Sequence, residues 1–383
     1  MNILVVGAHF YNKGAHLMMI AVLEELNKHS DITLFLSPTT GTKEQIADLG
    51  YRTIDYPLKH VADEQSFGAF LNYGGLIKLL KKKFRGELKL NKIDAVLDIS
   101  GFAFSDQWGS RLVENVNSLI KFFKKRGVKY IFLPQAFGPF TGAEIRAEMK
   151  EVLNTADLIL ARDKVSFEML KSISNGDTIQ QYPDITIGLK SKSNYLEAEQ
   201  YCCIVPNERM VDQGKEYWAE GKYIGYLKSA IQTLVEKEHT VYILLHDKGT
   251  GDVNLVNFLK DSFKDTDLVK VRAEEDPMKL KAFLGGARLV VGSRFHALVS
   301  ALSQNVPSLA LGWSHKYDML FEEYEIEDFS FTKPNDAHFK KCLENLMNEK
   351  EHSQIQQRIS GANEVLIEKN KKMWSEVLAV LKT

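Results

Sequence analysis

The sequence predicts an α/β protein built from two doubly wound domains. Three observations predict this class: strand-like and helix-like segments alternate, the alternation restarts after a polar stretch at residues 190–199, and the chain has 383 residues. At roughly 100–200 residues per domain, such a chain divides naturally into two. We expect one domain over residues 1–190, a second over 200–335, and a C-terminal helix over 350–383 that packs back on the first domain.

The first domain opens with a short apolar strand, followed by a turn-like segment from Gly7 to Gly14 and a helical pattern from Leu17 to Leu26. Apolar runs of strand length and segments of helix length then alternate. The predicted strands are Asn2–Val6, Asp31–Leu36, Ala95–Ile99, Tyr130–Leu133 and Leu158–Ala161, with helices such as Leu112–Lys125 and Ala143–Asn154 between them. This alternation favours parallel strands joined by helices.

The second domain repeats this architecture without any repeat of the sequence itself. Its predicted strands are Tyr201–Val205, Thr240–Leu245, Leu268–Val271, Leu289–Gly292 and Ser308–Leu311, and its helices include Tyr223–Glu236, Pro277–Gly286 and Ala297–Leu302. Open α/β sheets bind their ligands at the carboxyl ends of the strands. We therefore expect the functional residues in the loops that follow strands, facing a cleft between the domains.

The composition argues against several classes of partner and cofactor. Lys plus Arg number 49 and Asp plus Glu number 50, so no overall positive charge attracts nucleic acid, and we expect no nucleic-acid partner. Cys202 and Cys203 are adjacent and Cys342 stands alone, which is neither a disulfide framework nor a metal cluster. The chain shows no secretion signal and no apolar run of membrane-spanning length, so we expect a cytoplasmic protein without a bound metal.

Two loops of the first domain carry candidate binding residues. Asn12 and Lys13 precede the first helix, where free backbone amides and a lysine suit an anion, although neither nucleotide-binding glycine motif is present. The alternative is a glycine-containing turn with a solvated lysine. Asp98 and Ser100 stand at the end of another apolar run, and their alternative role is that of turn and helix-capping residues.

Arg162 ends a strongly apolar strand, immediately before Asp163, a natural N-cap residue. Its planar guanidinium suits the oxygens of a carboxylate or phosphate. A structural ion pair between Arg162 and Asp184 is the alternative interpretation.

The most specific pattern lies in the second domain, where Arg294 and His296 both follow the strand Leu289–Gly292. A histidine there titrates near neutral pH and can serve as a general acid or base, while the arginine can hold an anion. The alternative is a structural histidine and an arginine in an interdomain contact. Other strand ends supply Asn207, Arg209 and Lys316, the last of which is otherwise an exposed loop lysine.

Taken together, these motifs resemble the polysaccharide pyruvyltransferase family. The resemblance extends from about residue 3 to residue 330 and includes N-K-G-A, S-G-F, P-Q-A-F-G-P, A-R-D-K-V-S, Y-P-D-I, V-P-N-E-R-M, G-S-R-F-H-A and S-H-K-Y. The arginine-histidine motif with its following A-L-x-x-x-V-P is the most specific part. Ala15 and His16 stand where the commoner G-D-E-A form of the family has Asp and Glu.

The resemblance implies two Rossmann-like domains facing a cleft in the GT-B arrangement, the first on the acceptor side and the second on the donor side. It also implies transfer of pyruvate from phosphoenolpyruvate onto a sugar as a ketal, in the synthesis of a capsule or exopolysaccharide, without a cofactor. Phosphoenolpyruvate carries a carboxylate and a phosphate, so the donor site needs several cations. On this basis we assign donor binding to Arg162, Arg294 and Lys316, and acid/base chemistry to His296 with Asp98 or Asp184 as its partner. We expect further substrate contacts from Asn12, Lys13, Ser100, Asn207 and Arg209.

Two other functions remain open. A GT-B glycosyltransferase that uses a nucleotide sugar would share the fold and the cationic residues. A non-catalytic relative that only binds saccharide would fit the altered first loop.

The segment from Leu76 to Lys92 combines an apolar stripe at helical spacing with a concentration of lysines. Such a segment suits an anionic membrane surface. We expect it to attach the protein peripherally to the inner face of the cell membrane, where a lipid-linked oligosaccharide acceptor would lie. The alternative is an ordinary amphipathic helix with solvated lysines.

Overall fold

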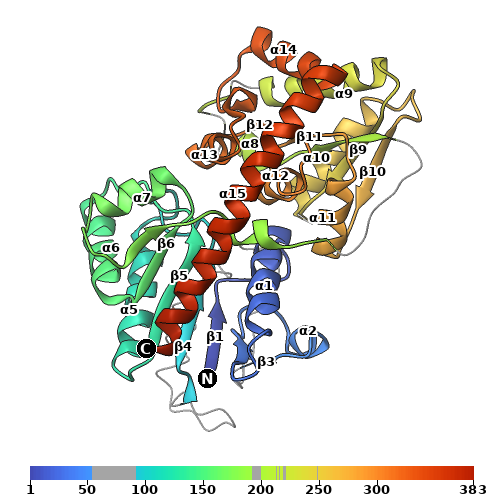
Figure 1. The fold of residues 1–383 in the computed structure, drawn as a ribbon. Helices are drawn as coiled ribbons and strands as arrows, with labels where there is room; N and C mark the ends of the chain where they lie inside the picture. Colours follow the sequence, from blue (N-terminus) through green and yellow to red (C-terminus); the bar gives the residue numbers. More distant parts are fainter. Residues whose placement is uncertain (54–91, 192–199, 213, 215, 219–220, 248) are drawn as a thin grey trace. The chain divides into compact units, whose positions relative to one another are not determined.

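A computed structural model describes residues 1–53, 92–191, 200–212, 214, 216–218, 221–247 and 249–383 (Figure 1). The predicted membrane-binding segment Leu76–Lys92 lies outside the described residues apart from Lys92. The chain forms two compact units. Unit 1 comprises Met1–Phe10, Ala15–Ile185 and Lys369–Thr383, and unit 2 comprises Tyr11–Gly14 and Thr186–Glu368.

Unit 1 contains a parallel sheet whose described strands number seven, in the order β3-β2-β1-β4-β5-β6-β7. The strands are β1 Asn2–Val6, β2 Thr33–Leu36, β3 Arg52–Thr53, β4 Ala95–Asp98, β5 Lys129–Gln135, β6 Leu158–Ala161 and β7 Ile179–Gln181. The helices are α1 Lys13–Leu26, α2 Lys43–Asp48, α5 Ser110–Lys124, α6 Ala143–Thr155 and α7 Lys164–Lys171, with a short 3₁₀ turn η2 Asp106–Trp108. A second 3₁₀ turn, η3 Ile185–Gly188, lies where the chain passes from unit 1 to unit 2. Apart from its additional edge strand, this order is that of a Rossmann sheet.

Burial of apolar side chains explains how the helices of unit 1 pack. On α5, Val113, Val116, Ile120 and Phe123 recur at helical spacing and are all fully buried. The central strands are buried along their whole length, as expected for a parallel sheet covered on both faces. Helices α5 and α6 pack side by side (Figure 1).

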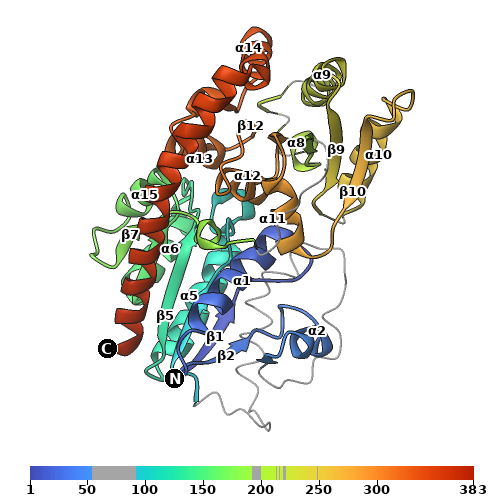
Figure 2. The same cartoon turned by 45° about the vertical axis from the view of Figure 1, so that its right-hand side comes forward.

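The long C-terminal helix α15, Glu349–Lys382, contributes its last turns to unit 1. Lys129 donates a hydrogen bond through Nζ to the carbonyl oxygen of Val380 at 2.6 Å, and Tyr182 donates one to Glu376 at 2.5 Å. In both views the C-terminal end of this helix, drawn in red, lies along the sheet of unit 1 (Figure 2). These bonds fix the end of the chain to β5 and to the loop after β7.

Unit 2 has a second parallel sheet, with six described strands in the order β10-β9-β8-β11-β12-β13. They are β8 Tyr201–Val205, β9 Thr240–Leu245, β10 Val269–Ala273, β11 Leu289–Gly292, β12 Ser308–Leu311 and β13 Ser330–Phe331. The helices are α8 Arg209–Asp212, α9 Lys222–Glu236, α10 Thr250–Asp261, α11 Pro277–Gly285, α12 Phe295–Leu302, α13 His315–Glu323 and α14 Asp336–Met347, with a 3₁₀ turn η4 Glu327–Phe329. This is again the Rossmann order.

The predicted α/β class with two Rossmann-like domains is confirmed by these sheets. Several helix boundaries differ from the prediction. Helix α1 begins at Lys13, because the side chain of Asn12 accepts the backbone N–H of Gly14 at 2.9 Å and starts the helix where the glycine suggested a loop. Lys316 likewise lies in the first turn of α13 and not in a loop. Helices α10 and α14 were not predicted.

None of the helices in the described part of the chain is both long enough and apolar enough to span a membrane.

Candidate functional site

The carboxyl edge of the unit 2 sheet gathers most of the polar residues predicted there. Asn207 and Arg209 follow β8, Arg294 and His296 follow β11, and Lys316 follows β12. Because the strands are parallel and adjacent, their carboxyl ends meet at one edge. The sheet therefore brings these five residues to the same edge of unit 2.

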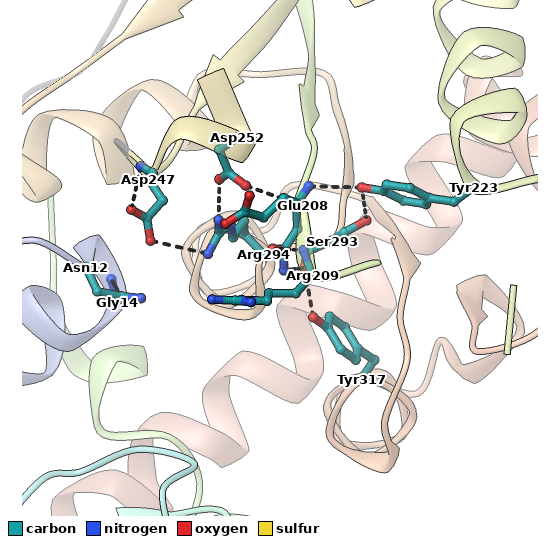
Figure 3. Close-up of polar contacts among 12 residues, drawn as sticks. Asn12, Gly14, Glu208, Arg209, Tyr223, Asp247, Asp252, Ser293, Arg294 and Tyr317 are labelled. Atoms are coloured by element: carbon teal, nitrogen blue, oxygen red, sulfur yellow. Dashed lines mark hydrogen bonds and ion pairs between the residues drawn. The ribbon is translucent and has the colours of Figure 1, made fainter. Parts of the chain in front are cut away.

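Arg294 is held at this edge by two carboxylates from the β9–α10 region (Figure 3). Its guanidinium bonds to Asp252, which is buried, and pairs with Asp247 at 3.4 Å. Burial disfavours the charged guanidinium, but Asp252 and Asp247 outweigh burial and raise the pKa of Arg294. Burial in turn raises the pKa of Asp252, against the opposing effect of the Arg294 charge. The arginine is thus a fixed cation with a defined orientation.

Hydrogen bonds from tyrosines fix the residue before Arg294. The hydroxyl of Tyr223 donates to Ser293 Oγ at 2.9 Å and accepts the backbone N–H of Asn207 at 3.0 Å. The backbone oxygen of Ser293 accepts from Tyr317 at 2.8 Å and from the side chain of Asn207 at 2.9 Å. Burial raises the pKa of Tyr223, so its hydroxyl stays protonated. The predicted binding residue Asn207 is therefore engaged in holding the β8 and β11 ends together.

His296 lies in the first turn of α12 and is half-buried. The segment Tyr11–Gly14 groups with unit 2, and a Cβ on Gly14 would overlap the Nδ1 of His296. Only glycine leaves room for the imidazole at that position. Two further contacts hold the segment: Lys13 donates to the carbonyl oxygen of Glu275, and Asn12 forms an isolated antiparallel bridge with Asp247.

The other two predicted cations have different surroundings. The ammonium of Lys316 lies 4.8 Å from the ring centroid of Trp313, 5.2 Å from that of Tyr317 and 6.0 Å from that of Phe295. This arrangement allows cation–π attraction. Arg209 pairs with Asp212 at 2.6 Å, and the two side chains are 39% and 46% exposed, so the pair contributes little to stability.

Four predicted residues of the first domain take part in two sets of polar contacts within unit 1. Asp98 accepts hydrogen bonds from Tyr130 at 2.7 Å and from the hydroxyl of Ser100 at 2.6 Å. Arg162 pairs with Asp184 at 3.1 Å, and both side chains are almost fully buried. The latter contact is the structural alternative that the sequence left open. The catalytic roles of Asp98 and Asp184 and the substrate-binding roles of Ser100 and Arg162 stay predictions.

Sequence reasoning missed three polar residues of the β9–α10 region, namely His246, Asp247 and Asp252. Burial, reinforced by Arg294, His296 and Lys13, lowers the pKa of His246 well below its ordinary value. A histidine and an aspartate directly after the apolar run Thr240–Leu245 were a detectable signal of the same kind as the one that singled out Arg294.

No group of three or more His, Cys, Asp or Glu side chains arranged to hold a metal ion occurs among the described residues. The expectation that the reaction uses no metal or cofactor stays a prediction.

A family model described as polysaccharide pyruvyl transferase matches residues 12–315. The amylovoran biosynthesis protein AmsJ of Erwinia amylovora is 23% identical over 247 residues, which is 60% of this chain and 59% of AmsJ. The chain thus aligns with under two thirds of the length of that relative.

Solved structures share the fold at low sequence identity. The UDP-GlcNAc 2-epimerase of Neisseria meningitidis has a TM-score of 0.58 and 13% identity, with 97% of this chain and 100% of that chain covered. A glycosyltransferase from Rickettsia africae has a TM-score of 0.62 and 13% identity, with 100% and 99% covered. Identities this low show the fold alone, and these neighbours are of the GT-B type that the resemblance implied.

Proposed function

The chain belongs to the polysaccharide pyruvyl transferase family, and we propose that it moves a pyruvyl group from phosphoenolpyruvate onto a saccharide as a ketal. The observation that carries this proposal is a family match extending over residues 12–315, which include both Arg294 and His296 at the carboxyl edge of the unit 2 sheet. The relation to a protein of amylovoran biosynthesis supports a role in making a surface polysaccharide.

The cations of unit 2 suit the donor. Phosphoenolpyruvate presents a carboxylate and a phosphate, and Arg guanidinium groups bind such oxygens in a bidentate manner. Arg294 is fixed in orientation by Asp252, and Lys316 adds a second positive charge beside aromatic rings. We assign the binding of the two donor anions to these residues, with Arg209 as a more exposed contributor.

The reaction balances without a redox step. The methylene carbon of the donor gains a proton, one sugar hydroxyl oxygen bonds to the central carbon, and the bond from that carbon to the phosphate oxygen breaks. A second sugar hydroxyl then bonds to the same carbon and closes the ketal. Of the two hydroxyl protons lost, one equivalent is taken up by the new methyl group and one leaves with phosphate.

We assign the proton transfers of this sequence to His296. It lies two residues from Arg294, so a donor held by the arginine has its reacting carbons near an imidazole. A positioned histidine of this kind typically contributes about 10²–10⁴-fold to a rate. Asp98 and Asp184 remain candidate partners, although in unit 1 they bond to Tyr130, Ser100 and Arg162.

For the acceptor we propose a lipid-linked oligosaccharide at an anionic membrane, on the sequence of Leu76–Lys92. Liposome binding tests this: it should require acidic lipid, fall with ionic strength, and drop when Lys81, Lys82 and Lys83 are replaced by Glu. Equal recovery of wild type and triple variant with acidic vesicles at low salt would remove the membrane role.

The assay for transfer follows both products. The purified protein is incubated with phosphoenolpyruvate and candidate saccharides, and phosphate release is measured together with the mass of the saccharide. We expect phosphate and a pyruvyl-modified saccharide in equal amounts. Phosphate without modified saccharide would indicate simple hydrolysis and contradict the transfer.

A nucleotide-sugar glycosyltransferase is the second candidate, favoured by the fold shared with a glycosyltransferase and with an epimerase solved with UDP-GlcNAc bound. Transfer of a sugar from a nucleotide sugar, with no response to phosphoenolpyruvate, would establish it in place of the first.

A further inference from the structure

The two carboxylates that contact Arg294 are not equivalent. The side chain of Asp252 is 2% exposed, whereas that of Asp247 is 27% exposed. Arg294 itself is 14% exposed. Arg294 therefore contacts one buried carboxylate and one that is partly exposed, and Figure 3 shows both contacts.

Asp252 is bound on both of its oxygens. Its Oδ1 accepts the backbone N–H of Glu208 at 2.8 Å, and its Oδ2 accepts from the NH2 of Arg294. Asp252 thereby connects α10, the loop after β8 and the residue after β11. Its removal would leave a largely buried guanidinium without its closest carboxylate, a change that is costly in proteins.

Asp247 holds the arginine far more loosely. Its Oδ2 lies 3.4 Å from the NH1 of Arg294, at the outer limit of a hydrogen bond, while its Oδ1 accepts the backbone N–H of Gly249 at 3.2 Å. Its backbone also bridges to Asn12. The position of Asp247 is thus set by its backbone and by Gly249, and its contact with Arg294 can be exchanged at little cost.

We propose that Asp247 is a place-holder carboxylate: it neutralises Arg294 while no donor is bound and gives up NH1 to an anionic oxygen of the incoming donor. Asp252 keeps the guanidinium oriented in both states. This assignment rests on the proposed function, in which Arg294 binds an anion of phosphoenolpyruvate. It makes Asp247 a residue that weakens donor binding, whereas Asp252 strengthens it.

The negative charge of Asp247 explains why it weakens donor binding. An anion that arrives at NH1 must displace the carboxylate of Asp247 and then lie beside its negative charge, so Asp247 opposes binding. Asp247→Asn removes that charge and keeps an oxygen able to accept from Gly249. From the modest strength of partly exposed ion pairs we expect about 2–5-fold tighter binding. Asp252→Asn lets the guanidinium turn, and we expect binding about 10-fold weaker or worse.

Isothermal titration calorimetry on the full chain measures the affinity of each variant, with phosphoenolpyruvate and inorganic phosphate as separate probes. The matched control is Asp261→Asn, which makes the same charge change at an exposed position on the same helix as Asp252, roughly 13 Å further along its axis. We expect the control to bind like the wild type. Thermal melting of each variant checks folding. If Asp252→Asn does not fold, the comparison of Asp247→Asn with Asp261→Asn still tests whether Asp247 weakens donor binding.

Each outcome has one meaning. Tighter binding in Asp247→Asn alone supports the place-holder. Unchanged or weaker binding in Asp247→Asn, or equal tightening in Asp261→Asn, overturns it and leaves the proposed function standing if the wild type binds phosphoenolpyruvate. A wild type that binds phosphate only removes the proposed donor, while the phosphate titrations still test Asp247. A wild type that binds neither probe overturns both proposals.

Discussion

Each unit places an arginine after an inner strand of its sheet, and the two arginines differ in their carboxylate partners. Arg162 of unit 1, after β6, pairs at 3.1 Å with Asp184, and the two side chains are 4% and 1% exposed. Arg294 of unit 2, after β11, is 14% exposed and contacts one buried and one half-exposed aspartate. The same sequence signature thus yields a closed ion pair in one unit and, in the other, an arginine with an exchangeable partner.

The largest effect is expected from a variant that tests whether unit 2 supplies the catalytic histidine. His296→Ala should lower pyruvyl transfer by about 10²–10⁴-fold, because the proton transfers lose their histidine. Folding should persist, since His296 is only half-buried. His338→Ala, which removes another half-buried histidine of unit 2, is the control and should keep full activity. A well-folded His296→Ala with full activity would take His296 out of the mechanism.

The second test contrasts the two arginines through stability. Asp184→Asn removes the carboxylate from the buried guanidinium of Arg162, so we expect unit 1 to lose about 3–5 kcal/mol. Asp247→Asn leaves Arg294 with Asp252, and we expect a change of about 0–1 kcal/mol. Urea unfolding measures both. Equal losses of unfolding free energy would mean that the two arginines are held alike, which contradicts the proposed difference between them.

The third test contrasts them through donor binding. Arg294→Ala should weaken phosphoenolpyruvate binding by about 10–150-fold, as for a lost hydrogen bond to a charged group worth about 1.5–3 kcal/mol. Arg162→Ala should also lower the melting temperature, because Asp184 loses its buried ion-pair partner. Titration calorimetry on folded protein separates the cases, and a comparable loss of affinity in Arg162→Ala would place both arginines in the donor site.

The fourth test concerns a pH dependence of stability that each unit should show. Burial, with the nearby His16, lowers the pKa of His9 in unit 1 to about 3, and burial lowers that of His246 in unit 2 well below its ordinary 6.5. Below about pH 6.5 the unfolded chain binds protons that the folded histidines do not, so stability falls as the pH falls. The slope for each histidine approaches a limit of about 1.4 kcal/mol per pH unit.

Unfolding at pH 7 and pH 5.5 measures this slope. His9→Gln and His246→Gln should each flatten it. An unchanged slope in both variants would show that neither histidine is responsible.

The fold could be predicted well from the sequence because the central strands are easily recognised. Tyr201–Val205 and Leu289–Gly292 are uninterrupted apolar runs, and the structure has strands with the same bounds. Short edge strands such as Arg52–Thr53 and Ser330–Phe331 were missed, because they have too few residues to show any periodicity.

The site was only partly predictable for a different reason. Arg294 and His296 follow their strand directly, so their position at the sheet edge could be read from the chain. The contact of Asp252 with Arg294 depends on how α10 turns back after β9, which is a tertiary relation. Likewise, the closeness of Gly14 to His296 joins residues that are far apart in the sequence.

The identity of the donor is the central claim, and thermal unfolding with added ligand tests it most directly. Phosphoenolpyruvate at about 100 times its dissociation constant should stabilise the protein by about 2.7 kcal/mol, and UDP-N-acetylglucosamine at the same concentration should leave it unchanged. Stabilisation by the nucleotide sugar and none by phosphoenolpyruvate would contradict the account.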